Sequence, residues 1–365
     1  MTPTNPNALL SLDICSRLPI HKNRAIRHKR SLLSARFAIA HSLASLCALA
    51  LVGCGGGGTD KSSIPADNTD AFLVSSLPAP SYTGQALRAF EMLNAERARC
   101  GFGQLAQNTR IDIAADGHSE WMLKNSIQVH DQIPGTVGFT GTTVGDRLRA
   151  AGYPSARTWG EVISPVDDWT KTAEAGVRLL LNAPYHGLNL LRGFREVGIG
   201  FRTSRDVDLP SEFLSGKLTI DLATSMADVG QSAGNNVVRS YPCEGTSGVL
   251  HLLWGESPSP IPDRDLFAHP IGTTVLIAGD INKKLTINSA HMTGPGGVAV
   301  ALRPAVTESN DPNSAPGRAY LASHEAFIST DAPLATNTSY QVSISGTNGA
   351  MPFSRTFSFM TGSPL

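Results

Sequence analysis

Residues 117–121, Gly-His-Ser-Glu-Trp, come closest to a nucleophile motif in this chain. A nucleophile elbow requires Gly-x-Ser-x-Gly at a sharp turn between a strand and a helix, so that the serine hydroxyl is exposed. Trp121 stands where the closing glycine belongs, and the segment has the apolar spacing of a helix interior. We therefore predict that Ser119 is not a nucleophile and that His118 is a core residue rather than a ligand. The chain contains no HExxH or Walker motif.

Cys54 indicates a different kind of chemistry. It follows a basic stretch and then an apolar run, residues 37–53, in the order of a secretory signal. Leu51-Val52-Gly53-Cys54 resembles a bacterial lipobox, which implies cleavage before the cysteine and a diacylglyceryl group joined to its thiol by a thioether, with palmitate among the acyl chains. We expect a lipoprotein signal peptide over 1–53 and a flexible, Gly/Ser/Asp-rich tether over 54–80. The alternative is cleavage at another small residue, which leaves Cys54 unmodified.

The other cysteines agree with export. Cys15 and Cys47 leave with the signal peptide, so that Cys100 and Cys243 are the two that remain beside Cys54. An even pair in an oxidising compartment predicts a disulfide between them. Two free buried thiols are the alternative.

The formal charge of zero is a sum of two unlike parts. The totals are 30 basic and 30 acidic residues, and residues 1–53 hold seven of the basic and one of the acidic ones. Subtraction leaves 23 basic and 29 acidic residues for 54–365, a charge of −6. An acidic mature chain makes nucleic acid the least expected partner.

The middle of the chain predicts helices followed by strands. Apolar residues recur at helical spacing over 85–99, 110–125 and 171–182, with Pro184 after the third segment. Alternation predicts strands over 159–164, 196–202 and 217–223. Helices that come early and strands that come late predict a layered α+β domain.

Seven segments of this region resemble the CAP superfamily, in its bacterial branch. They lie within residues 85–225 and read, in order, LNAERARCGFGQL, HSEWMLKN, VHDQ, GDRLRAAGY, WGEVIS, NAPYHGLNLL and REVGIGF. The resemblance implies a three-layer α-β-α sandwich over residues 81–244. It also implies a cavity lined by two histidines and one or two glutamates.

Carried over residue by residue, these positions are His130, Glu161 and His186. Two departures from the family pattern stand out. Val162 replaces the asparagine that usually follows the glutamate, and no second acid occurs at residues 182–183, after the third helix. The resemblance therefore implies three cavity residues with one acid.

Two neutral imidazoles beside a carboxylate allow two interpretations. His130 and His186 could hold Zn²⁺ or another divalent ion, with water completing the shell. Alternatively, the three side chains form a buried hydrogen-bonded cluster that joins their elements. Asp146, Arg147 and Asn189 also match family positions, and for them we predict loop and helix-end hydrogen bonds.

The last third of the chain predicts a second domain, over residues 245–365. A Gly-, Ser- and Pro-rich stretch over 235–262 indicates a linker. Beyond it, alternating segments predict strands over 273–278, 284–293, 298–303, 325–330, 338–346 and 354–361, which is typical of an all-β sandwich. Residues 334–342 resemble the tyrosine-corner region of bacterial Ig-like domains, which implies a spacer or adhesion module.

Together these observations predict a lipid-anchored protein of the bacterial cell envelope, at the outer membrane or the periplasmic face if the cell is Gram-negative. We expect a binding module for a lipid, sterol or cell-wall ligand, because the residues indicated for the cavity include no nucleophile. One alternative is a metal-dependent hydrolase or peptidase in which Glu161 is the general base. The other is a structural or adhesive envelope protein.

Overall fold

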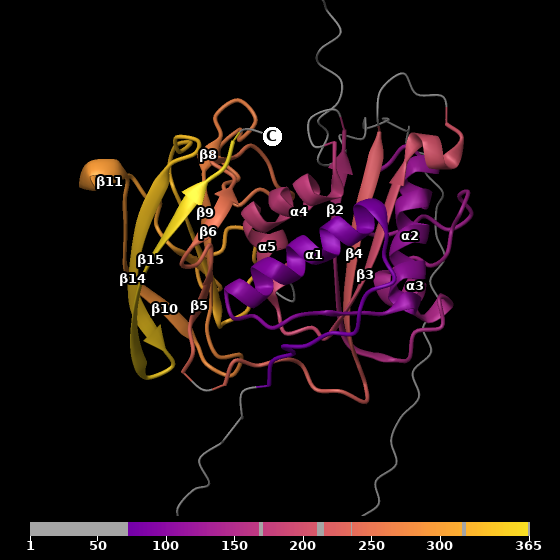
Figure 1. Cartoon of the computed structure of the whole chain (residues 1–365), viewed down its shortest axis with the longest axis horizontal. Helices are drawn as coiled ribbons and strands as arrows, with labels where there is room; N and C mark the ends of the chain where they lie inside the picture. Colours follow the sequence, from indigo (N-terminus) through magenta and orange to yellow (C-terminus); the bar gives the residue numbers. More distant parts are fainter. Residues whose placement is uncertain (1–71, 168–170, 210–214, 235, 316–318, 364–365) are drawn as a thin grey trace, which may run out of the picture. The chain divides into compact units, whose positions relative to one another are not determined.

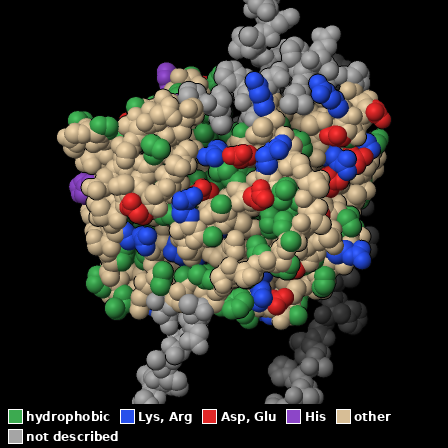
Figure 2. Space-filling view, in the orientation of Figure 1, with side chains coloured by type: hydrophobic (Ala, Val, Ile, Leu, Met, Phe, Trp, Pro, Cys, Tyr) green, Lys and Arg blue, Asp and Glu red, His purple; other side chains and the backbone are tan. Residues whose placement is uncertain are grey.

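The structure, a computed structural model, describes residues 72–167, 171–209, 215–234, 236–315 and 319–363. The predicted signal peptide, Cys54 and most of the predicted tether lie outside these ranges. All described residues belong to one compact unit. None of their helices is long and apolar enough to cross a membrane. Basic and acidic side chains are interspersed over the face shown in Figure 2.

The first sheet has four strands in the order β1-β3-β4-β2. Strand β4 pairs antiparallel with β2 and β3, and β1 pairs parallel with β3. The strands are β1 (Ala106–Gln107), β2 (Ala156–Val166), β3 (Glu196–Thr203) and β4 (Gly216–Ser225). This order places β2, the strand that carries Glu161, at an edge of the sheet.

Helices cover both faces of this sheet (Figure 1). They are α1 (Gly84–Arg99), α2 (Thr109–Lys124), α3 (Val144–Ala150), α4 (Ala173–Asn182) and α5 (Pro184–Leu191), with a short 3₁₀ helix, η1 (Ser204–Val207), after β3. Helices α2 and α3 pack on one face, where Ile111 and Leu148 join a shared core. Helices α1, α4 and α5 pack on the other, around Phe90, Leu181 and Ile220.

Two further sheets form the C-terminal part. One is ordered β12-β13-β9-β5 and the other β11-β10-β14-β15-β6. The first contains β5 (Arg239–Tyr241), β9 (Thr274–Ala278), β12 (Val306–Thr307) and β13 (Glu325–Ser329), and the second contains β6 (Thr246–Val249), β10 (Leu285–Thr293), β11 (Ala299–Val300), β14 (Ser339–Asn348) and β15 (Met351–Thr361). A small pair, β7 (Leu252–Leu253) and β8 (Ile271–Gly272), and a 3₁₀ helix, η2 (Pro295–Gly297), complete the elements.

Strand β9 contributes to two hydrophobic cores, one on each face of its sheet. Val275 and Ile277 pack with Phe357 and other residues of the five-stranded sheet. Leu276, between them, faces the opposite way and joins the core of α1, α4 and α5. Every residue of β9 is buried because both faces of its sheet are covered. The core beside α5 therefore continues into the C-terminal sheets, and the domain boundaries at 80/81 and 244/245 stay predictions.

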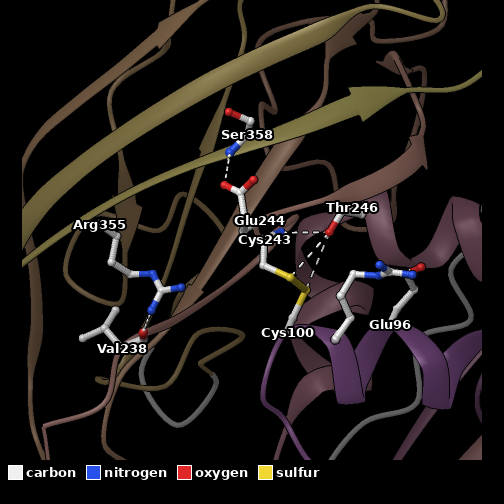
Figure 3. Close-up of a disulfide and its surroundings, with 9 residues drawn as sticks. Glu96, Cys100, Val238, Cys243, Glu244, Thr246, Arg355 and Ser358 are labelled. Atoms are coloured by element: carbon white, nitrogen blue, oxygen red, sulfur yellow. Dashed lines mark hydrogen bonds and ion pairs between the residues drawn. A yellow bond between two sulfur atoms is a disulfide. The ribbon is translucent and has the colours of Figure 1, made fainter.

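The disulfide between Cys100 and Cys243 is present (Figure 3). Cys100 is the residue that ends α1, and Cys243 lies between β5 and β6. Thr246 lies beside the bridge, with its Oγ1 3.5 Å from Cys243 Sγ and 3.0 Å from the Cys243 nitrogen, which donates to it. The bridge thus joins the first helix to the point where the chain enters the five-stranded sheet.

The mixed helix-and-strand class predicted from the sequence is confirmed. The three predicted helices correspond to α1, α2 and α4, and the strands predicted over 159–164, 196–202 and 217–223 lie within β2, β3 and β4. Pro184 follows the end of α4 as expected, but it is also the first residue of α5, where a missing N–H costs nothing. In the C-terminal part, Ala335 N donates to Tyr340 Oη at 2.9 Å, within the segment that resembles a tyrosine corner.

Candidate functional site

The site is built around Glu161 in the middle of β2. Side chains alternate along a strand, so Glu161 faces α2 and α3 together with Ile163, while Val162 faces α4 and the opposite core. The Glu161 side chain is only 1% exposed. A buried carboxylate requires partners on both oxygens, and Glu161 has them. Arg147 Nη2 donates to Oε2 at 2.5 Å, and His130 Nδ1 lies 2.8 Å from Oε1.

Arg147 is held in place by the start of α3. Thr143 and Asp146 form a capping box at that helix end, so the hydrogen-bonding role predicted for Asp146 is confirmed. Arg147 Nη1 also donates to the carbonyls of His130 and Thr142, at 2.9 and 3.1 Å. Its guanidinium therefore fixes the loop that carries His130, in addition to neutralising Glu161.

Ionisation of Glu161 is strongly favoured. Burial by itself raises the pKa of a carboxyl group, but the hydrogen bond from His130 and the positive charge of Arg147 outweigh that effect and lower the pKa of Glu161 to about 2. Glu161 is therefore a carboxylate throughout the physiological range, with both oxygens engaged. This state suits an orienting residue and does not suit a general base, which needs a free lone pair and a pKa near the working pH.

His118 and Ser119 are core residues, as predicted. His118 is fully buried, its Nε2 lies 3.0 Å from the Val129 carbonyl oxygen, and its Nδ1 accepts from Gln132 Nε2 at 3.1 Å. Burial lowers the pKa of His118 to about 4, so the ring is neutral at pH 7. Ser119 Oγ bonds inside the sheet, to the Gly200 carbonyl and to Thr219. It is fully buried and has no access to a substrate.

Asp221 on β4 is the cross-strand neighbour of Glu161. It is fully buried, and neither carboxyl oxygen has a hydrogen-bond partner among the described residues. Burial, and next the negative charge of Glu161, raise the pKa of Asp221 well above its ordinary value of 3.8. Asp221 is therefore the protonated member of the pair and Glu161 the ionised one.

We expect Asp221→Asn to raise the free energy of unfolding at pH 7. Below pH 3.8 Asp221 is protonated in both the folded and the unfolded chain, so the substitution brings no gain there. Above pH 3.8 the unfolded chain releases the proton while the folded chain keeps it, and this difference lowers wild-type stability as the pH rises. Asn cannot ionise, so the variant does not lose stability in this way as the pH rises. Urea unfolding of both proteins at pH 7 and pH 3.5 measures the difference in their free energies of unfolding.

Asp208→Asn is the matched control for this prediction. Asp208 is exposed and has a positive φ of 53°, a conformation that Asn adopts readily. Its substitution should change stability by less than about 0.5 kcal/mol at either pH. Equal or lower stability of Asp221→Asn at pH 7 would contradict the assignment of the proton.

His186 has its own buried acid, which the sequence analysis missed. His186 Nδ1 lies 2.7 Å from Glu256 Oε1, and the same oxygen accepts from the His186 backbone nitrogen at 2.9 Å. The Glu256 side chain is completely buried. His186 lies in the first turn of α5, where a carboxylate is favoured by the helix dipole. Glu256 does not itself line the pocket, so it is a second acid behind His186 and does not replace the one that the family pattern places after the third helix.

The structure brings His130, Glu161 and His186 to one open pocket with a volume of about 200 Å³. From the first part of the chain, Tyr185, Asn189 and Arg192 also line it. From the C-terminal part come Ser257, Pro258, Ala319 and Tyr320. Asn189, for which a structural role was predicted, donates from Nδ2 to the Glu161 carbonyl at 3.1 Å and thus ties α5 to β2.

The donor atoms at this pocket do not fit a zinc site. Catalytic zinc needs three protein ligands, and no group of three or more His, Cys, Asp or Glu side chains in the described part of the chain is arranged to hold a metal ion. Glu161 uses its oxygens for Arg147 and His130. His130 and His186 each turn Nδ1 to a carboxylate, so neither Nδ1 is available to a metal ion.

Comparisons with known proteins add little to this picture. No family model matches the chain, and no curated protein matches it. Among solved structures, the chain is similar to an extracellular protein containing a SCP domain from Bacillus anthracis str. Ames, at 26% identity and a TM-score of 0.31. The match covers 39% of this chain and 41% of that one. A TM-score of this size does not establish a shared fold, so the family stays a proposal.

Proposed function

We propose that this chain is an exported CAP-superfamily protein of the bacterial cell envelope, anchored by lipid at Cys54, whose pocket binds a ligand. Support for the family comes from the seven segments between residues 85 and 225, in their order. Support for export comes from the signal-like first 53 residues and the lipobox-like sequence that ends at Cys54. The Cys100–Cys243 disulfide agrees with an oxidising compartment.

The observation that carries the binding function is the matched arrangement of the two histidines. His130 lies in the loop between α2 and α3 and His186 in α5, and both line the same pocket. Each ring is oriented by a buried carboxylate on Nδ1, Glu161 for the first and Glu256 for the second. A carboxylate partner fixes the position and tautomer of an imidazole, which leaves Nε2 available to a ligand.

Binding is favoured over metal-dependent hydrolysis for two reasons. The general base of the hydrolase hypothesis is Glu161, whose oxygens are engaged and whose pKa is lowered to about 2. The described donors also fall short of a three-ligand metal shell. An adhesive role does not account for a pocket in which two histidines are held by buried acids.

We expect the double substitution His130→Ala and His186→Ala to weaken ligand binding by at least about tenfold, because two directed hydrogen bonds are lost. The measurement uses proteins that all carry Cys54→Ser, so that no lipid anchor binds the vesicles. It is co-sedimentation with three probes: insoluble cell wall, phosphatidylglycerol vesicles and sterol-containing vesicles. His291→Ala, on the exposed side of β10, is the matched control and should bind as the wild type does. Equal binding of every probe by all three proteins would refute a function for the pocket.

A further inference from the structure

The C-terminal part of the chain supplies one wall of the pocket, and this wall is fixed to α5. Asn313 Nδ2 donates to the Ser259 carbonyl at 2.7 Å and to Tyr185 Oη at 2.9 Å. Tyr185 Oη donates in turn to Asp311 at 2.5 Å. Ser259, the residue after the pocket residues Ser257 and Pro258, is thus held with Tyr185 in one hydrogen-bonded frame. The wall is preorganised, as a binding site requires.

The charged side chains at the pocket are already neutralised within the protein. Arg192 makes two hydrogen bonds of 2.8 Å to the two oxygens of Glu325, which is buried in β13. Glu161 is paired with Arg147 and His130, and His186 with Glu256. A charged ligand would have to break one of these pairs, so the described residues favour a neutral one.

The polar groups that face the pocket disfavour an apolar ligand. The imidazoles of His130 and His186 and the amide of Asn189 lie along its wall. A lipid chain or sterol ring would cover these groups without offering them hydrogen bonds, which disfavours its binding. The ligand must therefore carry several donors and acceptors of its own.

Two aromatic rings complete the wall. Tyr185 and Tyr320 both line the pocket, with ring centroids 5.2 Å apart and planes inclined at 47°. Arg192 Nη2 donates to the Tyr320 carbonyl at 2.9 Å, which ties this residue to the end of α5. An aromatic surface beside several hydrogen-bonding groups suits a molecule that has one apolar face and a polar rim.

We infer that the pocket binds a neutral carbohydrate chain, with one sugar ring against Tyr320 and its hydroxyl or acetamido groups bonded to the Nε2 atoms of His130 and His186. A neutral sugar ring combines a face of C–H groups with a rim of hydroxyl groups and carries no charge. The pocket volume of about 200 Å³ is below the roughly 300–1,000 Å³ of sites that enclose a whole small molecule. It therefore accepts one ring of a chain that continues into solvent. The inference rests on the proposed binding function of this pocket.

The test is calorimetric titration of the exported protein with a β-1,4-linked N-acetylglucosamine tetramer. We expect Tyr320→Leu to weaken binding by about tenfold, because it keeps apolar volume but removes the ring. Tyr320→Phe keeps the ring and should bind within about threefold of the wild type. A tetramer of galacturonic acid, which is charged, should bind more weakly than the neutral tetramer. Unfolding curves of both variants show whether each one is folded.

The outcomes separate this inference from the binding function itself. No binding of the neutral tetramer, or equal binding by the wild type and Tyr320→Leu, would overturn the inference. Should phosphatidylglycerol or sterol vesicles then bind in a way that requires His130 and His186, the binding function would stand with a different ligand class. If no probe binds in a way that requires these histidines, both the carbohydrate inference and the proposed binding function are refuted.

Discussion

Replacement of Glu161 with alanine is expected to lower the free energy of unfolding by about 3–5 kcal/mol at pH 7. The substitution leaves the fully buried guanidinium of Arg147 without its carboxylate, and it removes the partner of His130 Nδ1. The carbonyls of residues 130 and 142 still accept from Arg147, but they do not neutralise its charge. Chemical denaturation of both proteins under the same conditions measures the difference.

The pH dependence of this difference follows from the lowered pKa of Glu161. A carboxylate with a folded-state pKa of about 2, against an ordinary 4.5, stabilises the protein above pH 4.5. That contribution is lost as the pH falls from 4.5 toward 2, so the cost of Glu161→Ala should shrink over this window. A cost that stays constant down to pH 2.5 would contradict the assignment.

Two further variants separate charge from packing. Glu120→Gln removes a partly exposed acid that pairs with Lys124 one turn along α2, and it should cost less than about 0.5 kcal/mol. Glu161→Gln combined with Arg147→Met should be less destabilised than Glu161→Gln alone, since no buried charge then lacks a partner. The opposite order would show that Arg147 stabilises the fold mainly by its hydrogen bonds to carbonyls.

Loss of the Cys100–Cys243 disulfide should have an effect of similar size. The two cysteines are 143 residues apart in sequence, and closing a loop of this length restricts the unfolded chain by an amount worth about 5 kcal/mol in the chain-entropy estimate. Cys100→Ala combined with Cys243→Ala is therefore expected to lower the free energy of unfolding by about 2–5 kcal/mol. Urea denaturation without reductant measures it.

Reduction of the wild-type protein provides the control for this experiment. Dithiothreitol should bring wild-type stability close to that of the double alanine variant and leave the variant itself unchanged. A difference below about 1 kcal/mol between oxidised wild type and variant would mean that the unfolded chain is already compact around this loop.

The elements that could be predicted from the sequence are those with many turns or clear alternation. Helices α1 and α2 each have 16 residues, enough for several repeats of the apolar spacing. Helix α3 has seven residues and α5 has eight, and neither is long enough to show a period. Helix α5 also begins directly after α4, at a proline that was interpreted only as a stop signal.

The pocket residues of the candidate site could be predicted from the sequence, but the buried acid behind His186 could not. His130, Glu161 and His186 were indicated by resemblance, and the structure places them at one pocket. Glu256 was missed because it lies in a Gly-, Ser- and Pro-rich stretch that has no period and was interpreted as a linker. A contact between residues 70 positions apart depends on the tertiary fold, and no local pattern in a single sequence encodes it.

The position of the pocket between two parts of the chain has a consequence for how the protein is made. The lining residues run from His130 to Tyr320, and the wall from the C-terminal part includes Ala319 and Tyr320. A nascent chain therefore has no finished pocket until Tyr320 has been made, and ligand capture is postponed to a chain that contains both parts.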